Sequence, residues 1–151
     1  MGAIEEFTGL LSELEVVALD SMAFIYHFES HLSYGPLTFE LFSRIEDGTL
    51  QAHTSILTVS EVLVGARKAG DKQLEQLYLQ VFDLLPNLEV HGIDKACAVI
   101  AADLRVQEHL RMPDALQVAT AIQCGAQVLV TNDARLRHLP QIKTVMLSDY
   151  A

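Results

Sequence analysis

The chain has 151 residues, half of them hydrophobic, and a formal net charge of −10 from 10 basic and 20 acidic side chains. This length and apolar content predict one compact domain with a sizeable core, whereas the charge argues against a broad basic surface that coats nucleic acid. Charged residues interrupt every apolar stretch before the roughly 20 residues that a membrane-spanning helix requires, so no membrane segment is expected.

The N-terminus also argues against export. Glu5 and Glu6 occupy the place where a secretory signal has positive charge followed by an apolar block, so we expect a cytoplasmic protein. Cys97 and Cys124 lack metal-knuckle spacing, which favours small buried thiols over a disulfide framework. No repeat or linker divides the chain, so we predict a single domain over residues 1–151, with 1–14 as an N-terminal helical extension.

Short runs rich in β-branched residues alternate with segments of helical periodicity. In chain order, strands are predicted at 15–19, 52–56, 88–90, 127–131 and 143–147. Helices are predicted at 36–48, 71–85, 94–110 and 113–124, and another is expected to begin after Thr58 as its N-cap. This alternation is typical of an α/β fold with a mainly parallel sheet covered on both faces.

Acidic residues follow the predicted strands. Asp20 comes directly after strand 15–19, and Asp133 comes two residues after strand 127–131. Asp114 follows Pro113 in the first turn of a predicted helix, and Glu61 lies near another predicted helix start. Helix N-termini and the carboxyl ends of parallel strands share one rim of an α/β sheet, so we expect the four carboxylates to meet there.

Four converging carboxylates repel one another unless they are protonated or bridged by a cation, and oxygen ligands of this kind suit Mg²⁺ or Mn²⁺. Each residue also has a purely structural explanation. Asp20 and Asp133 can cap turns, and Asp114 can favour a helix dipole. Glu61 can complete a capping box with Thr58. The joint placement on one rim is what favours a metal site.

These residues and their surroundings resemble the PIN-domain family, particularly toxin ribonucleases of the VapC type. The resemblance covers most of the chain and rests on VVALDSMAFIYHFE, TSILTVSEVLVGA, LRMPDALQVATAIQCGAQ and VLVTND. It implies a three-layer α/β/α sandwich in which Asp20, Glu61, Asp114 and Asp133 hold one or two Mg²⁺ or Mn²⁺ ions for RNA hydrolysis. Ser21, Thr131 and Asn132 match accessory positions of the family.

The resemblance further implies an endoribonuclease, a homodimer and an antitoxin partner. Six basic residues are candidates to grip the RNA backbone: Arg67, Lys68, Arg105, Arg111, Arg135 and Arg137. A PIN nuclease of RNA processing is the alternative enzyme, and a catalytically silent protein-binding module is the alternative of another class. The apolar faces of helices 37–46 and 74–85 are a groove for an antitoxin helix, a homodimer face or ordinary core.

Two other types of site are disfavoured. His27 and His31 flank Glu29, but HFESH is not the H-E-x-x-H pattern of a zinc helix. A phosphate-accepting receiver is equally disfavoured, because the first strand is followed by no D-x-D and no strand-end lysine of the receiver kind is present. Metal-dependent hydrolysis of RNA, which the resemblance implies, is therefore the expected function.

Overall fold

The computed structural model describes residues 2–151 and contains every predicted strand to within two residues at either end. The elements are, in chain order, α1 (Ala3–Ser12), β1 (Val16–Leu19), α2 (Ser21–Phe28), α3 (Gly35–Asp47), β2 (Gln51–Ser55), α4 (Ile56–Lys68), α5 (Lys72–Leu84), β3 (Leu88–His91), α6 (Lys95–Glu108), α7 (Met112–Gln123), β4 (Val128–Thr131), the 3-10 helix η1 (Ala134–Leu136), β5 (Thr144–Met146) and the 3-10 helix η2 (Leu147–Asp149).

The five strands form one sheet in the order β3-β2-β1-β4-β5. Every neighbouring pair is parallel. The first strand, β1, lies at the centre of the sheet. Strands β2 and β3 follow on one side of it, and β4 and β5 lie on the other side. The strand order therefore reverses between β1 and β4, and such a switch point is where open α/β sheets bind ligands.

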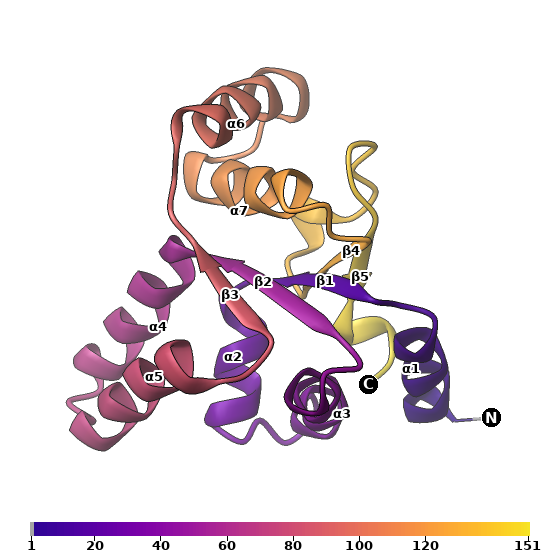
Figure 1. The fold of residues 1–151 in the computed structure, drawn as a ribbon, viewed down its shortest axis with the longest axis vertical. Coiled ribbons are helices and arrows are strands. Elements are labelled where there is room, and N and C mark those ends of the chain that lie inside the picture. The colour runs from indigo at the N-terminus through magenta and orange to yellow at the C-terminus, as the bar shows by residue number, and fades with distance from the viewer. Residues whose placement is uncertain (1) are drawn as a thin grey trace.

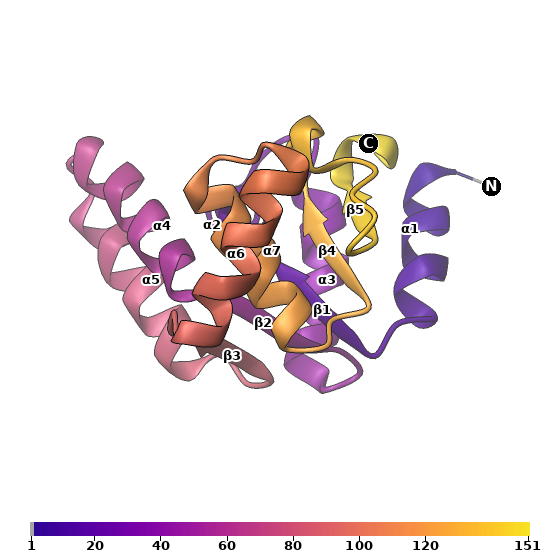
Figure 2. The same cartoon turned by 90° about the horizontal axis from the view of Figure 1, so that it is seen from above.

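Helices cover both faces of the sheet, which confirms the predicted α/β/α sandwich (Figure 1). One core cluster packs the five helices α1, α2, α3, α4 and α5 on one face of the sheet, against strand residues such as Val17 and Val130. A second cluster joins α6 and α7 to the opposite face, through Ala18 and Leu129. Seen from above, the α4–α5 pair flanks one end of the sheet and α1 flanks the other (Figure 2).

Local signals set most helix ends as predicted. Asp71 caps α5 by accepting from the amide of Leu74, and Asp94 caps α6 by accepting from the amide of Cys97. Helix α3 ends at Gly48, whose φ of 86° places it in the left-handed region that favours glycine. These ends depend on neighbours a few residues away, so the sequence alone could indicate them.

The predicted start of the helix that carries Glu61 is wrong. Helix α4 begins at Ile56, and Ser55 is its N-cap because its hydroxyl accepts from the amide of Leu57 at 3.1 Å. Strand β2 ends at Ser55, so the helix follows the strand with no loop between them. Thr58 is a buried residue inside α4, and the capping-box explanation of Glu61 fails with it.

The N-terminal helix packs onto the body of the protein. Phe7 and Leu11 of α1 are almost completely buried, and the ring of Phe7 lies 5.2 Å from that of Tyr150 near the C-terminus. The predicted apolar face of α3 is ordinary core, although Phe39 on the same helix is 61% exposed. Helix α5 buries Tyr78 but leaves Leu84 75% exposed. Within residues 2–151, no helix is both long enough and apolar enough to cross a membrane.

Candidate active site

Asp20 and Asp133 lie at the switch point of the sheet, one after each of the two central strands. Asp20 follows β1 and caps α2, since its carboxylate accepts from the amide of Met22 at 3.0 Å. Asp133 follows β4 and caps η1 in the same way, accepting from the amide of Arg135 at 3.0 Å. Both caps fit the structural explanation offered by the sequence, and they also aim both carboxylates at one rim.

All four acidic residues singled out in the sequence line one small hollow at this rim, with a volume of about 100 Å³. Its lining also includes one of the three predicted accessory residues and two of the predicted RNA-binding arginines. The complete lining is Asp20, Ser21, Met22, Glu61, Arg111, Asp114, Gln117, Asp133, Arg135 and Leu136. The four acids therefore lie around one point of the fold.

Asp20 is the most buried of the four acids, with 7% of its surface exposed. The hydroxyl of Thr131 donates to its second carboxylate oxygen, and the same hydroxyl accepts from the amide of Asp133 at 3.1 Å. Burial raises the pKa of the Asp20 carboxyl to about 7, although the hydrogen bonds from Thr131 and Met22 act in the opposite direction. Nearby positive charge would therefore strongly favour the ionised form.

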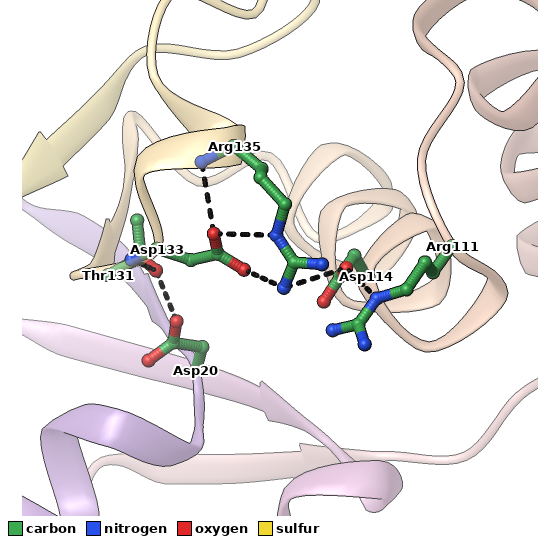
Figure 3. A network of polar contacts seen from close by, with 6 residues as sticks. All are labelled: Asp20, Arg111, Asp114, Thr131, Asp133 and Arg135. Atoms are coloured by element: carbon green, nitrogen blue, oxygen red, sulfur yellow. Dashed lines mark hydrogen bonds and ion pairs between the residues drawn. The ribbon is translucent and has the colours of Figure 1, made fainter.

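Two arginines supply positive charge at the outer acids (Figure 3). Arg135 donates from Nε and Nη2 to the two oxygens of Asp133, at 3.0 and 2.6 Å, and its Nη2 lies 3.5 Å from Asp114. Arg111 donates to Asp114 at 3.2 Å. The hydrogen bond from Arg135 holds the pKa of Asp133 below its usual range.

A chain of hydrogen bonds holds Glu61. The amide nitrogen of Gln117 donates to Glu61 at 3.1 Å and to the hydroxyl of Thr58 at 2.9 Å. The Thr54 hydroxyl lies 2.8 Å from that of Thr58 and 2.7 Å from the carbonyl oxygen of Leu19. These hydrogen bonds link Glu61 to Leu19 at the end of β1, the residue directly before Asp20.

Sequence reasoning missed Gln117. The available signal was its position three residues after Asp114, which places both side chains on one face of α7. Its carboxamide is buried and lines the hollow. Gln117 is therefore a positioning residue for Glu61.

The family model for the PIN domain matches residues 17–142. This span is most of the chain, and it includes all four acids and the switch point. The chain belongs to the PIN-domain family. No sequence among the curated proteins matches it.

Solved structures with the same fold include a toxin–antitoxin complex and two VapBC structures. VapBC2 from Rickettsia felis, bound to a DNA fragment from its promoter, superposes with a TM-score of 0.70 at 19% identity, covering 87% of this chain and 98% of the other. A toxin–antitoxin complex from Klebsiella pneumoniae has a TM-score of 0.66 at 23% identity, covering 87% and 97%. DNA-bound VapBC from Salmonella typhimurium gives 0.66 at 20% identity, covering 89% and 99%. At these identities the likeness establishes the PIN fold.

The donor atoms of this PIN domain fit a hard divalent cation. Asp20, Glu61, Asp114 and Asp133 offer only carboxylate oxygens, which are the ligands that Mg²⁺ and Mn²⁺ prefer. No three of these four carboxylates have oxygens within 4.8 Å of one another, and Arg135 contacts both Asp133 and Asp114. The guanidinium group of Arg135 therefore balances the negative charge of these two acids, and the Arg135 side chain is half exposed.

The remaining predicted site residues of the PIN domain lie outside the hollow. Asn132 donates to the hydroxyl of Tyr26 at 3.3 Å and accepts from the amide of Ser148 at 2.8 Å, so it fastens the loop after β4. Two predicted RNA-binding arginines pair with acids elsewhere, as Arg67–Glu75 and Arg137–Asp149. The exposed Lys68 and Arg105 do not line the hollow either.

The two histidines of HFESH are part of the packing of the PIN domain. His27 stacks on the ring of Phe42 with 4.5 Å between centroids. Nδ1 of His31 accepts from the backbone amides of Ser33 and Tyr34, both at 3.1 Å. This agrees with the rejection of a zinc helix at the sequence level.

Proposed function

We propose that this chain is a Mg²⁺- or Mn²⁺-dependent endoribonuclease of the VapC toxin type, acting on RNA in the cytoplasm. One observation carries the proposal: four carboxylates from separate parts of the fold line one hollow at the switch point of the sheet, flanked by two arginines. A nuclease for phosphodiesters needs both groups, oxygen ligands for a cation and positive charge for phosphate.

Asp20, Glu61, Asp114 and Asp133 are the residues that would hold the cation. A divalent ion bound there supplies the positive charge that lowers the pKa of a water molecule and stabilises developing charge on phosphate oxygens. The protein's own contribution is to orient the carboxylates. Thr131 fixes the carboxylate of Asp20.

Gln117 and Ser21 are proposed to complete the inner site. Gln117 donates to Glu61 and so orients a carboxylate that is otherwise exposed. Ser21 follows Asp20 and lines the hollow, where its hydroxyl offers a hydrogen-bond partner for water or phosphate. These groups act by position, and no covalent intermediate with the enzyme is required.

Arg111 and Arg135 are proposed to bind the RNA backbone. Both guanidinium side chains are more than half exposed and already lie at the mouth of the hollow. Arginine binds phosphate in a bidentate manner, and two such residues suffice to hold one scissile phosphate without a broad basic surface. This resolves the apparent conflict between an RNA substrate and a net charge of −10.

The proposed partners are an antitoxin and a second copy of the chain. One structure with this fold is described as a toxin–antitoxin complex and another as a member of the VapBC family of toxin–antitoxin systems, which supports a protein inhibitor here. Co-expression with the protein encoded beside this one, followed by light scattering, measures both assemblies. A stable complex that blocks RNA cleavage is expected, and release of the partner is expected to restore cleavage.

Cleavage of a mixed RNA pool tests the proposed activity. Partner-free protein is incubated with Mg²⁺, Mn²⁺ or EDTA, and the cut sites are mapped by sequencing. The wild type is expected to cut with either metal and not with EDTA. Asp114→Asn is expected to lose at least about 100-fold in rate, since it removes a ligand charge from the site.

Asp103→Asn is the matched control. Asp103 is an exposed aspartate of α6 outside the hollow, so its neutralisation is expected to leave cleavage unchanged. Equal, metal-insensitive results for wild type and Asp114→Asn, across the whole pool, would reject the nuclease and favour a silent PIN-fold binding module.

A further inference from the structure

A second group of potential metal ligands lies on the sheet, apart from the acidic hollow. His53 on β2 and Glu89 and His91 on β3 bring three ligand atoms within 4.8 Å of one another. Across residues 2–151, this is the only such group of three or more His, Cys, Asp or Glu side chains. None of the three lines the hollow that holds the acidic residues.

Strand register explains why these side chains meet. His53 pairs directly with Glu89 across the parallel β2–β3 ladder, so both side chains leave the same face of the sheet. His91 lies two residues beyond Glu89 and shares that face. His53 also pairs with Ala18, which belongs to the α6–α7 core, so the group faces the α6–α7 side.

The distances suit one small cation. Nδ1 of His53 lies 2.8 Å from Nε2 of His91 and 3.7 Å from Oε2 of Glu89, and Nε2 of His91 lies 3.9 Å from the same oxygen. Ligands about 2.0–2.1 Å from a tetrahedral ion are about 3.3 Å apart. Small side-chain rotations would therefore place all three ligand atoms around one ion.

The two imidazoles are also already aligned for a shared ligand. Their ring nitrogens form a hydrogen bond of 2.8 Å, in which one ring donates its N–H and the other accepts, so loss of that proton leaves two lone pairs directed at one spot. A divalent cation at that spot would use both lone pairs and the carboxylate charge together. Nitrogen ligands favour Zn²⁺ and related transition metals over Mg²⁺.

We propose that His53, Glu89 and His91 form a Zn²⁺ site that fastens the edge strand β3 to β2. The side chains of His91 and Glu89 are 29% and 67% exposed, so the ion has access from solvent and a water molecule completes its coordination. Strand β3 is an edge strand with a neighbour on one side only, and a cross-strand ion adds to the backbone ladder that joins it to β2. The site is independent of the proposed nuclease activity.

Zinc binding to EDTA-stripped protein tests the site, with affinity measured by competition against a chromogenic chelator. The wild type is expected to bind one Zn²⁺ per chain at least about 100-fold more tightly than the double variant His53→Ala/His91→Ala. A thermal melt at a free zinc concentration of 100 times Kd is expected to rise by about 5 to 10 °C for the wild type alone.

Two controls separate this site from other zinc ligands. Cys124 is a free and partly exposed thiol, whereas Cys97 is buried, so Cys124 is the soft ligand to exclude, and Cys124→Ser is expected to keep tight binding. Asp114→Asn/Asp133→Asn is also expected to keep it, because these acids belong to the hollow.

Glu89→Gln keeps the proposal testable if the double histidine variant does not fold. Glu89 is exposed, so its substitution is compatible with the fold, and loss of one charged ligand is expected to weaken zinc binding at least about tenfold. Equal zinc affinity in the wild type and in a folded variant of His53 and His91, or in Glu89→Gln, would overturn the proposal.

Discussion

The hydroxyl of Thr131 at the end of β4 donates to the carboxylate of Asp20 at the end of β1, joining residues that lie 111 positions apart in the chain. The same hydroxyl accepts from the amide of Asp133. One buried side chain therefore sets the relative positions of two of the four acids. In this structure, Thr131 links the end of β1 to the loop after β4 through its hydroxyl group.

Thr131→Val keeps the shape of this side chain and removes both hydrogen bonds. We expect metal affinity and RNA cleavage to fall by about 10- to 100-fold, as for other groups that orient metal ligands. Unfolding is expected to cost about 1–3 kcal/mol less, since Asp20 loses a buried partner. Calorimetric Mn²⁺ titration and urea denaturation measure the two effects. Thr131→Ser retains the hydroxyl and is the control, and equal losses in both variants would count against the hydrogen bond as the cause.

Asp20→Asn is expected to change the pH dependence of stability in EDTA. The pKa of Asp20 is raised from 3.8 to about 7, so the folded state binds more protons than the unfolded state between these values. The wild type therefore loses stability as pH rises from about 4 to 7, and the asparagine variant lacks that part of the slope. At 1.36 kcal/mol per pKa unit, the difference between the free energies of unfolding of the two proteins should change by roughly 2–4 kcal/mol across this range.

Asp133→Asn is the comparison for the same experiment. Arg135 lowers the pKa of Asp133, so the stabilisation from that carboxylate is present above its unfolded pKa and is lost as pH falls through the folded value. Its neutralisation is expected to destabilise the protein near neutral pH. Urea denaturation at a series of pH values measures both variants. If the two substitutions changed the pH dependence of the free energy of unfolding in the same direction, the raised pKa of Asp20 and the lowered pKa of Asp133 would be contradicted.

Arg135→Gln is expected to separate metal binding from cleavage. The guanidinium neutralises Asp133 and reaches Asp114, so its removal should tighten Mg²⁺ or Mn²⁺ binding about three- to tenfold, the scale of one exposed ion pair. Cleavage should nevertheless slow, because the phosphate loses a bidentate partner. Metal titration and single-turnover cleavage measure the two effects.

Arg137→Gln is the matched control for Arg135. Arg137 pairs with Asp149 outside the hollow, and its substitution is expected to change neither metal affinity nor cleavage. Equal effects of the two arginine substitutions would indicate a general loss of positive charge rather than a specific role at the acids.

Phe7→Ala tests whether the N-terminal helix is an integral part of the fold. Phe7 is completely buried and contacts Tyr150, so we expect a loss of about 3–5 kcal/mol in the free energy of unfolding. Ile4 on the same helix is 39% exposed, and Ile4→Ala is expected to cost less than about 1 kcal/mol. Thermal and urea denaturation measure both, and a small loss in Phe7→Ala would mean that α1 is only loosely attached.

The sequence by itself determined the strands, most helix ends and the sheet rim that carries the acids. Asp20 follows one strand directly, Asp133 lies two residues after another, and Asp114 follows a proline in the first turn of a helix. These features depend on periodicity and on neighbours a few residues away, so they can be predicted from a single sequence. Two local errors stand out. Helix α2 (Ser21–Phe28) was not predicted, and the cap placed at Thr58 was wrong because a strand passes into a helix there without a loop.

The tertiary structure alone decided which side chains meet across long separations. It paired Gln117 with Glu61, and it directed Arg135 to the acids but Arg137 to Asp149. It also placed His53 against His91, two residues 38 positions apart on neighbouring strands. Such contacts depend on strand order and register, and on the rotamers that packing allows, and no local pattern in the chain encodes these.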